Sequence, residues 1–153
     1  MKDQSWKYTI LLAQDNSNDW MLVEQAFLEI DLSSDLFFVQ DGIELLQYLR
    51  KQGRFTGSTP APRPDLILLD LNMPRKDGRQ ALAEIKTDPD LRSIPVVVLT
   101  NSDTQEDILR TYDLGGAGFI IKPQNFEGMV EVAKVLKQYW FEVVELVSAE
   151  RVK

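Results

Sequence analysis

The sequence predicts an α/β domain: a doubly wound parallel sheet with helices on both faces. Five apolar segments of strand length recur along the chain, and amphipathic helical patterns separate them. Some of these segments are continuously apolar instead of alternating, which is typical of strands covered on both faces. Strands that alternate with helices five times form a parallel sheet joined by right-handed crossovers. The predicted fold is therefore a (βα)5 sheet.

Five short apolar segments carry the strand prediction. The segments near Ile10, Ile67 and Val96 are the continuous ones, so we expect both faces of these strands to be covered. The expected strands span 8–13 (YTILLA), 36–39 (LFFV), 65–71 (DLILLDL), 95–100 (PVVVLT) and 118–122 (GFIIK).

Apolar residues at spacings of three and four predict the helices, as at Trp20, Val23 and Phe27. A Ser/Asp/Thr cluster precedes the fourth helix, and such residues cap helices. The expected helices span 19–30, 43–49, 80–85, 104 or 105 to 114, and about 125 to about 148. The long connection 53–64 is rich in Gly, Pro and Ser and predicts a surface loop.

Length and composition limit the classes of protein. The 153 residues fit one domain, expected over 1–153 with a core of about 8–147. The net charge of −7 without a Lys/Arg cluster argues against nucleic-acid or anionic-membrane partners. The chain has no cysteine, no signal-like start and no apolar stretch near the roughly 20 residues of a membrane span. A cytoplasmic location is the expectation.

The chain also has no histidine. This excludes imidazole bases, phosphohistidine carriers and most zinc sites. Any chemistry must use carboxylates, hydroxyls and lysines.

Polar residues stand where four expected strands end. Gln14 and Asp15 follow the first strand, Asp70 the third, Thr100 the fourth and Lys122 the fifth. Each alone has a structural explanation, such as a turn or a helix cap. Ligands of such sheets bind at the carboxyl ends of the strands, so the shared placement predicts one site. Two carboxylates ~4 Å apart repel by about 4 kcal/mol at an effective dielectric near 20 and favour a cation such as Mg²⁺.

These residues resemble those of a response regulator receiver domain of the CheY-like type. The resemblance covers nearly the whole chain and rests on Asp15, the motif DLNMPRKDG, the Thr after VVVL and the Lys-Pro pair. The stretch 65–102 is especially similar to single-domain regulators of phytochrome-type histidine kinases. The resemblance implies a flavodoxin-like sheet with strand order 2-1-3-4-5 and an extended C-terminal helix.

The resemblance also implies a function in two-component signal transduction. Asp70 would accept a phosphoryl group from the phosphohistidine of a partner kinase, making the protein a phosphoacceptor switch and not a metabolic enzyme. Asp15, Asp70 and the main-chain carbonyl of Asn72 would hold Mg²⁺. Thr100 would hydrogen-bond the phosphoryl group, and Lys122 would add positive charge.

Further residues take expected roles from the same resemblance. Phe119 stands where the family has an aromatic switch, although a core aromatic fits equally well. Pro123 would hold the lysine loop in one course, and a cis bond before it is the expected means. Gly78 suits a positive φ. Ser102, with Asn72, is expected near the phosphoryl group, where it would influence the approach of a hydrolytic water.

Gln14 departs from the acidic pair that is usual in the family. A glutamine can hydrogen-bond a metal-bound water but brings no charge. The formal charge of Gln14, Asp15, Asp70 and Lys122 is then −1 instead of −2, so we expect weaker binding of Mg²⁺.

Other readings of the sequence remain. A pseudo-receiver would act as an interaction module without phosphorylation. A flavodoxin-like redox carrier would need a loop rich in glycine and hydroxyl groups after the first strand, where this chain has AQDNSND. Phosphatases with an aspartyl nucleophile need a second acid where this chain has Asn72.

The last helix predicts a contact with another subunit. One apolar stripe along it fits the core, and a second stripe lies almost opposite. The second stripe comprises Val132, Val135, Tyr139 and Leu146. With Trp140 it is expected to form a homodimer; the alternative is a tail folded onto its own domain. No effector segment follows the receiver-like part, so the signal is expected to leave by surface contact.

Overall fold

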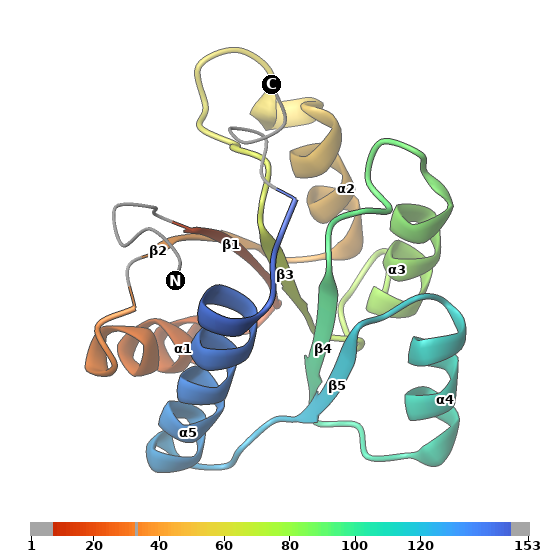
Figure 1. The fold of residues 1–153 in the computed structure, drawn as a ribbon. Helices are drawn as coiled ribbons and strands as arrows, with labels where there is room; N and C mark the ends of the chain where they lie inside the picture. Colours follow the sequence, from red (N-terminus) through yellow and green to blue (C-terminus); the bar gives the residue numbers. More distant parts are fainter. Residues whose placement is uncertain (1–7, 33, 148–153) are drawn as a thin grey trace.

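The computed structural model describes residues 8–32 and 34–147. A five-stranded parallel sheet with the order β2-β1-β3-β4-β5 runs through these residues (Figure 1). The strands are β1 (Tyr8–Ala13), β2 (Ser34–Val39), β3 (Leu66–Leu69), β4 (Val96–Thr100) and β5 (Gly118–Ile121). The predicted fold class and strand order are confirmed.

Each major helix begins after a residue whose side chain accepts a hydrogen bond from the first helical turn. The helices are α1 (Ser17–Glu29), α2 (Gly42–Arg50), α3 (Gly78–Thr87), α4 (Gln105–Asp113) and α5 (Phe126–Leu136). The caps are Asn16, Asp41, Asp77, Thr104 and Asn125. Helices α1, α2 and α3 start one to two residues earlier than predicted, because the residues that open them are polar or glycine and leave no trace in apolar spacing.

The helices cover both faces of the sheet. Helices α1 and α5 pack on one face, while α2 and α3 pack on the other (Figure 1). Along β1, Leu11 and Ala13 join the core beneath α2 and α3, whereas Ile10 and Leu12 join the core beneath α1 and α5. Both sets are buried, which explains the continuous apolar run.

The connection 53–64 is mostly exposed, as predicted, but it contains a short 3₁₀ turn, η1 (Gly53–Phe55). Phe55 of this turn is buried against Tyr48 of α2. Burial raises the pKa of Tyr48, whose hydroxyl donates to the carbonyl of Pro62. The loop is thereby tied to the domain.

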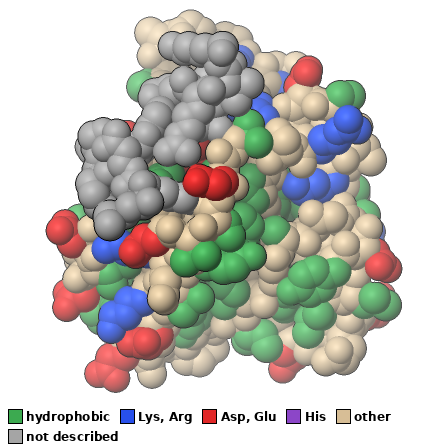
Figure 2. Space-filling view, viewed as in Figure 1, with side chains coloured by type: hydrophobic (Ala, Val, Ile, Leu, Met, Phe, Trp, Pro, Cys, Tyr) green, Lys and Arg blue, Asp and Glu red, His purple; other side chains and the backbone are tan. Residues whose placement is uncertain are grey.

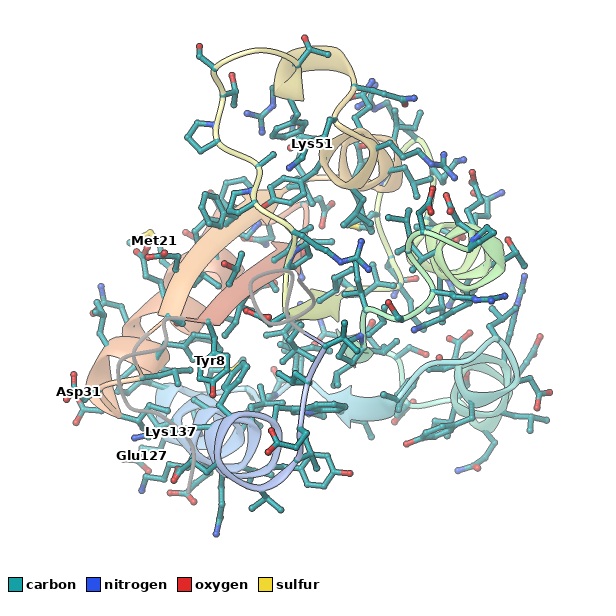
Figure 3. The ribbon with its side chains drawn as sticks, turned by 45° about the horizontal axis from the view of Figure 1, so that its top comes forward. Tyr8, Met21, Asp31, Lys51, Glu127 and Lys137 are labelled. Carbon is teal, nitrogen blue, oxygen red and sulfur yellow. The ribbon has the colours of Figure 1, made fainter. Side chains whose placement is uncertain are left out.

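The C-terminal helix is shorter than predicted. After α5, a π-helical segment, η2 (Lys137–Val143), follows directly, and the chain turns extended at Val144. The end predicted near Ser148 lies outside the described residues. Tyr8 stacks on Phe141 of η2, with ring centroids 4.2 Å apart, and lies beside this helix in Figure 3. The wide turns thus bring Phe141 into the core.

No helix within residues 8–32 and 34–147 combines the length and the apolar character that crossing a bilayer requires.

Candidate functional site

The site lies where the carboxyl ends of β1, β3, β4 and β5 meet. The main-chain N–H of Asp70 donates to the carbonyl of Ala13 at 3.0 Å, which aligns the ends of β3 and β1. The N–H of Lys122 donates to the carbonyl of Thr100 at 2.7 Å, which aligns β5 with β4. The sheet therefore fixes the main-chain positions from which these side chains extend.

Asp70 is the centre of the site. Its carboxylate is buried, and both of its oxygens accept hydrogen bonds. Oδ1 accepts from the Thr100 hydroxyl at 2.7 Å and from the main-chain N–H of Asn72 at 3.2 Å. Oδ2 accepts from Gln14 Nε2 at 2.7 Å and from Lys122 Nζ at 3.5 Å. A carboxylate with four donors is held in one orientation and stays satisfied despite burial.

Gln14 contacts Asp70 directly. Its side chain is 2% exposed, and besides donating to Asp70 it accepts from the main-chain N–H of Asn16 at 3.1 Å. Its own main-chain carbonyl accepts from the indole N–H of Trp20 at 2.6 Å. The amide of Gln14 thus donates directly to the Asp70 carboxylate. Its contact to a metal-bound water stays a prediction.

Asp15 follows Gln14 at the same edge but lies outside the buried cluster. It is exposed and makes no hydrogen bond or ion pair with any residue in 8–32 or 34–147. Its oxygens therefore keep their coordination positions for a ligand.

Lys122 has a second acidic partner that the sequence pattern did not indicate. Its side chain is 5% exposed, and its ammonium lies 3.0 Å from Asp19 Oδ2, closer than its 3.5 Å distance to Asp70 Oδ2. Asp19 stands in the first turn of α1, because that helix begins at Ser17 and not at residue 19 as predicted. With Asp19 included, the formal charge of the site is −2, against −1 for the four predicted residues alone.

Gly78 is required by close approach and not by the predicted positive φ. A Cβ at Gly78 would stand 2.2 Å from the carbonyl oxygen of Asp70 and 2.7 Å from Cα of Leu71. The positive φ of this loop falls on Arg75 instead, at 65°. The start of α3 thus packs directly on the main chain that carries Asp70.

Two further expectations concern the Lys122–Pro123 peptide bond and Phe119. No peptide bond in the described residues is cis, so the Lys122–Pro123 bond is trans and the suggested cis bond was wrong. Phe119 is half-buried on β5, opposite Val98 of β4, and its role as a switch stays a prediction.

Ser102 is engaged away from Asp70. Its hydroxyl donates to Asp107 Oδ2 at 2.5 Å, and Arg79 donates to both oxygens of Asp107 at 2.7 and 2.6 Å. The hydrogen bond from Arg79 and, to a smaller extent, the one from Ser102 lower the pKa of Asp107 to about 2. This cluster connects α3, which follows Asp70, with the loop after Thr100.

The donor set fits a hard divalent cation. Carboxylate and carbonyl oxygens from Asp15, Asp70 and Asn72 stand at one sheet edge, and such oxygens suit Mg²⁺ when waters complete its shell. In the part of the chain that the structure describes, no three acidic, histidine or cysteine side chains gather as a closed metal cluster. An open site of one or two carboxylates is the arrangement these residues allow.

Comparison with known proteins agrees with this geometry. Residues 10–134 match the family model described as response regulator receiver domain. Response regulator Rcp1 of Synechocystis sp. is 39% identical over 140 residues, covering 92% of this chain and 93% of that protein.

Solved structures of response regulators are also similar to this chain. The phosphorylated cyanobacterial phytochrome response regulator RcpA has a TM-score of 0.85 at 40% identity, covering 94% of this chain and 100% of that one. The Mn²⁺-bound form of Rcp1 has a TM-score of 0.83 at 38% identity, covering 92% and 99%. Together with the strand order and the clustered strand-end residues, these matches show that the chain belongs to the response regulator receiver domain family.

Proposed function

We propose that this response regulator acts as a phosphoacceptor switch, with Asp70 as the residue that is phosphorylated. The observation that carries the proposal is the environment of its carboxylate. Asp70 is fixed just after the carboxyl end of β3, within hydrogen-bonding distance of the Thr100 hydroxyl and the Lys122 ammonium. These are the groups that an incoming phosphoryl anion needs.

In the proposed reaction, a carboxylate oxygen of Asp70 attacks the phosphorus of a phosphohistidine. The new O–P bond forms as the N–P bond breaks, and the departing imidazole keeps the electron pair and takes up a proton. Lys122 neutralises charge on the phosphoryl oxygens, and Thr100 donates a hydrogen bond to them. The donor is another protein, since this sequence contains no histidine.

We propose Mg²⁺ as the cation of the site. Asp15, Asp70 and the main-chain carbonyl of Asn72 would hold it. When bound, the cation offsets the negative charge that the carboxylates and the phosphoryl group share. The Rcp1 structure with Mn²⁺ supports this choice, because Mn²⁺ and Mg²⁺ prefer the same oxygen ligands.

The proposed partner is a phytochrome-type histidine kinase. RcpA and Rcp1, which the chain resembles at 38–40% identity, are both response regulators, and RcpA is a phytochrome response regulator. A phytochrome kinase labelled with radioactive ATP should transfer its label to this protein faster than a kinase of an unrelated pathway does. A cytoplasmic location for this exchange stays a prediction of the sequence.

The function is tested by mass spectrometry after incubation with acetyl phosphate and Mg²⁺. The wild type should gain the mass of one phosphoryl group, and Asp70→Asn should gain none. Asp113→Asn, the same change at the exposed end of α4, should behave like the wild type. A wild type that gains no mass, or an Asp70→Asn variant that does, would show that Asp70 is not the phosphoacceptor.

One observation favours a second candidate, a phosphorylation-independent interaction module. Gln14 donates directly to Asp70, so the carboxylate is satisfied without any cation. If this bond keeps Mg²⁺ out, the surface would signal without phosphoryl transfer. The same acetyl phosphate experiment separates the two candidates.

We also propose that the protein forms a homodimer through the C-terminal helical region. Val135, Tyr139 and Val143 follow one another about one turn apart and are each more than half exposed. Figure 2 shows hydrophobic side chains on the face of the molecule that carries α5. Trp140, Val132 and Leu146, which were predicted to join the interface, are instead partly buried against the domain's own core.

A further inference from the structure

The buried ammonium of Lys122 lies between two carboxylates. Asp19 Oδ2 is 3.0 Å away, and Asp70 Oδ2 is 3.5 Å away. The side chain of Asp70 is buried, whereas that of Asp19 is 29% exposed. The resting site therefore divides one positive charge between the phosphoacceptor and a residue of α1.

Main-chain structure holds Asp19 and Lys122 next to each other. The main-chain N–H of Lys122 is bonded to Thr100, and α1 is fixed at its start by the Asn16 cap, whose side chain accepts from the N–H of Asn18 at 2.8 Å. Asp19 and Lys122 are 103 positions apart in the sequence. The contact thus arises from the junction of β1 with α1 and the end of β5, and both partners are positioned by main-chain structure.

We propose that Asp19 is a positioning residue, which shares the Lys122 ammonium with Asp70 and supplies the second negative charge that Gln14 lacks. The inference rests on the proposed function. A phosphoryl group on Asp70 would compete with Asp19 for the same ammonium, because its oxygens carry more charge than the carboxylate they replace. Asp19 therefore favours the bound cation and opposes the phosphorylated state.

This role predicts opposite effects on two ligands. In Asp19→Asn, loss of one negative charge should weaken Mg²⁺ binding by about threefold. At saturating Mg²⁺, the same variant should bind beryllofluoride, an analogue of the phosphoryl group, about threefold more tightly, since Lys122 then has no competing carboxylate. An Asp19 that merely stabilises the first turn of α1 would not move the two affinities in opposite directions.

Isothermal titration calorimetry on the full chain measures both affinities. Glu24→Gln is the matched control, because it removes one acid from α1 at an exposed position that makes no ion pair within the described residues. It should leave both affinities unchanged. Asp19→Glu keeps the charge and should stay close to the wild type, and thermal unfolding checks that each variant is folded.

The outcomes separate the inference from the function on which it rests. If the wild type binds both ligands and Asp19→Asn shifts neither, or shifts both in the same direction, the positioning role is refuted and the phosphoacceptor function stands. A wild type that binds neither Mg²⁺ nor beryllofluoride overturns both. Opposite shifts, absent from Glu24→Gln and reduced in Asp19→Glu, support the proposal.

Discussion

At the scale of single residues, the site is governed by where charge is present and where it is missing. Gln14 replaces a charge with a hydrogen bond to Asp70, and Asp19 supplies a charge from α1. The buried carboxylate of Asp70 accepts hydrogen bonds from several donors, among them Thr100 and the main-chain N–H of Asn72. Substitutions that restore or remove one charge should therefore affect the folded apoprotein and the cation-bound protein differently.

Gln14→Glu should raise the affinity for Mg²⁺ by about tenfold, because it adds a carboxylate beside Asp70. Without the cation, the variant should be about 2 kcal/mol less stable than the wild type, since it loses the amide donor and places two buried acids together. Calorimetry and urea unfolding, each with and without Mg²⁺, measure the two effects. Gln25→Glu, on the exposed face of α1, is the control and should change neither. An unchanged or lower Mg²⁺ affinity would contradict the prediction.

Gly78→Ala tests the close contact beneath Asp70. The added Cβ would meet main-chain atoms at 2.2 and 2.7 Å, so we expect a loss of about 2 kcal/mol or more in the free energy of unfolding. Slower phosphorylation by acetyl phosphate should accompany this loss, because Asp70 itself must shift. In Gly118→Ala the nearest atom, in Val97, is 3.6 Å away, and this control should be nearly neutral. Equal stability of the two variants would show that the contact at Gly78 relaxes freely.

At the scale of elements, the cluster of Arg79, Ser102 and Asp107 connects the two loops that flank the site. Arg79 lies at the start of α3, and Asp107 lies in the first turn of α4. Ser102 belongs to the loop that follows Thr100. A movement of Thr100 toward a phosphoryl group would therefore strain contacts between α3 and α4.

Asp107→Asn should lower the stability at pH 7 by about 1–2 kcal/mol, because it removes charge-assisted hydrogen bonds. The pKa of Asp107 is about 2 in the folded protein and about 3.9 in an unfolded chain. A depressed folded-state pKa stabilises the protein above the unfolded value, and the stabilisation is lost as the pH falls toward 2. The difference in urea stability between wild type and variant should thus shrink below about pH 4. A difference that stays constant from pH 7 to pH 3 would argue against an ionic role.

At the scale of the whole molecule, the exposed apolar residues Val135, Tyr139 and Val143 set the expected assembly. The described tail after η2 folds along its own domain, since Leu146 packs on the core. Some residues that were predicted to contact a second subunit therefore pack within their own domain. The proposed interface therefore rests on fewer exposed apolar residues than the sequence predicted.

Multi-angle light scattering at high micromolar concentration should give the mass of a dimer for the wild type. Tyr139→Glu should give a monomer, because a charge would be buried at the interface. Leu28→Glu changes another exposed apolar residue, on α1, and should remain dimeric. A wild type that is monomeric both with and without phosphodonor would remove the proposal.

The apolar segments predicted five strands within two residues of their observed bounds, and the family resemblance predicted their order. A parallel strand covered on both faces must be continuously apolar, so a polar residue marks its end and thus the edge where ligands bind. For this reason the sequence pattern placed Asp70, Thr100 and Lys122 at the same end of the sheet, where the structure has them. Apolar spacing carries no such signal for polar helix starts, and α1 was consequently placed too late.

Which polar groups pair with one another follows from the folded arrangement of the chain. The hydrogen bond from Gln14 to Asp70 and the ion pair of Asp19 with Lys122 join residues 56 and 103 positions apart. Likewise, Gly78 is required by the main chain it approaches, and the C-terminal helix turns π-helical where Phe141 packs on Tyr8. Such contacts depend on side-chain direction and on the packing of distant elements, which local residue patterns do not encode.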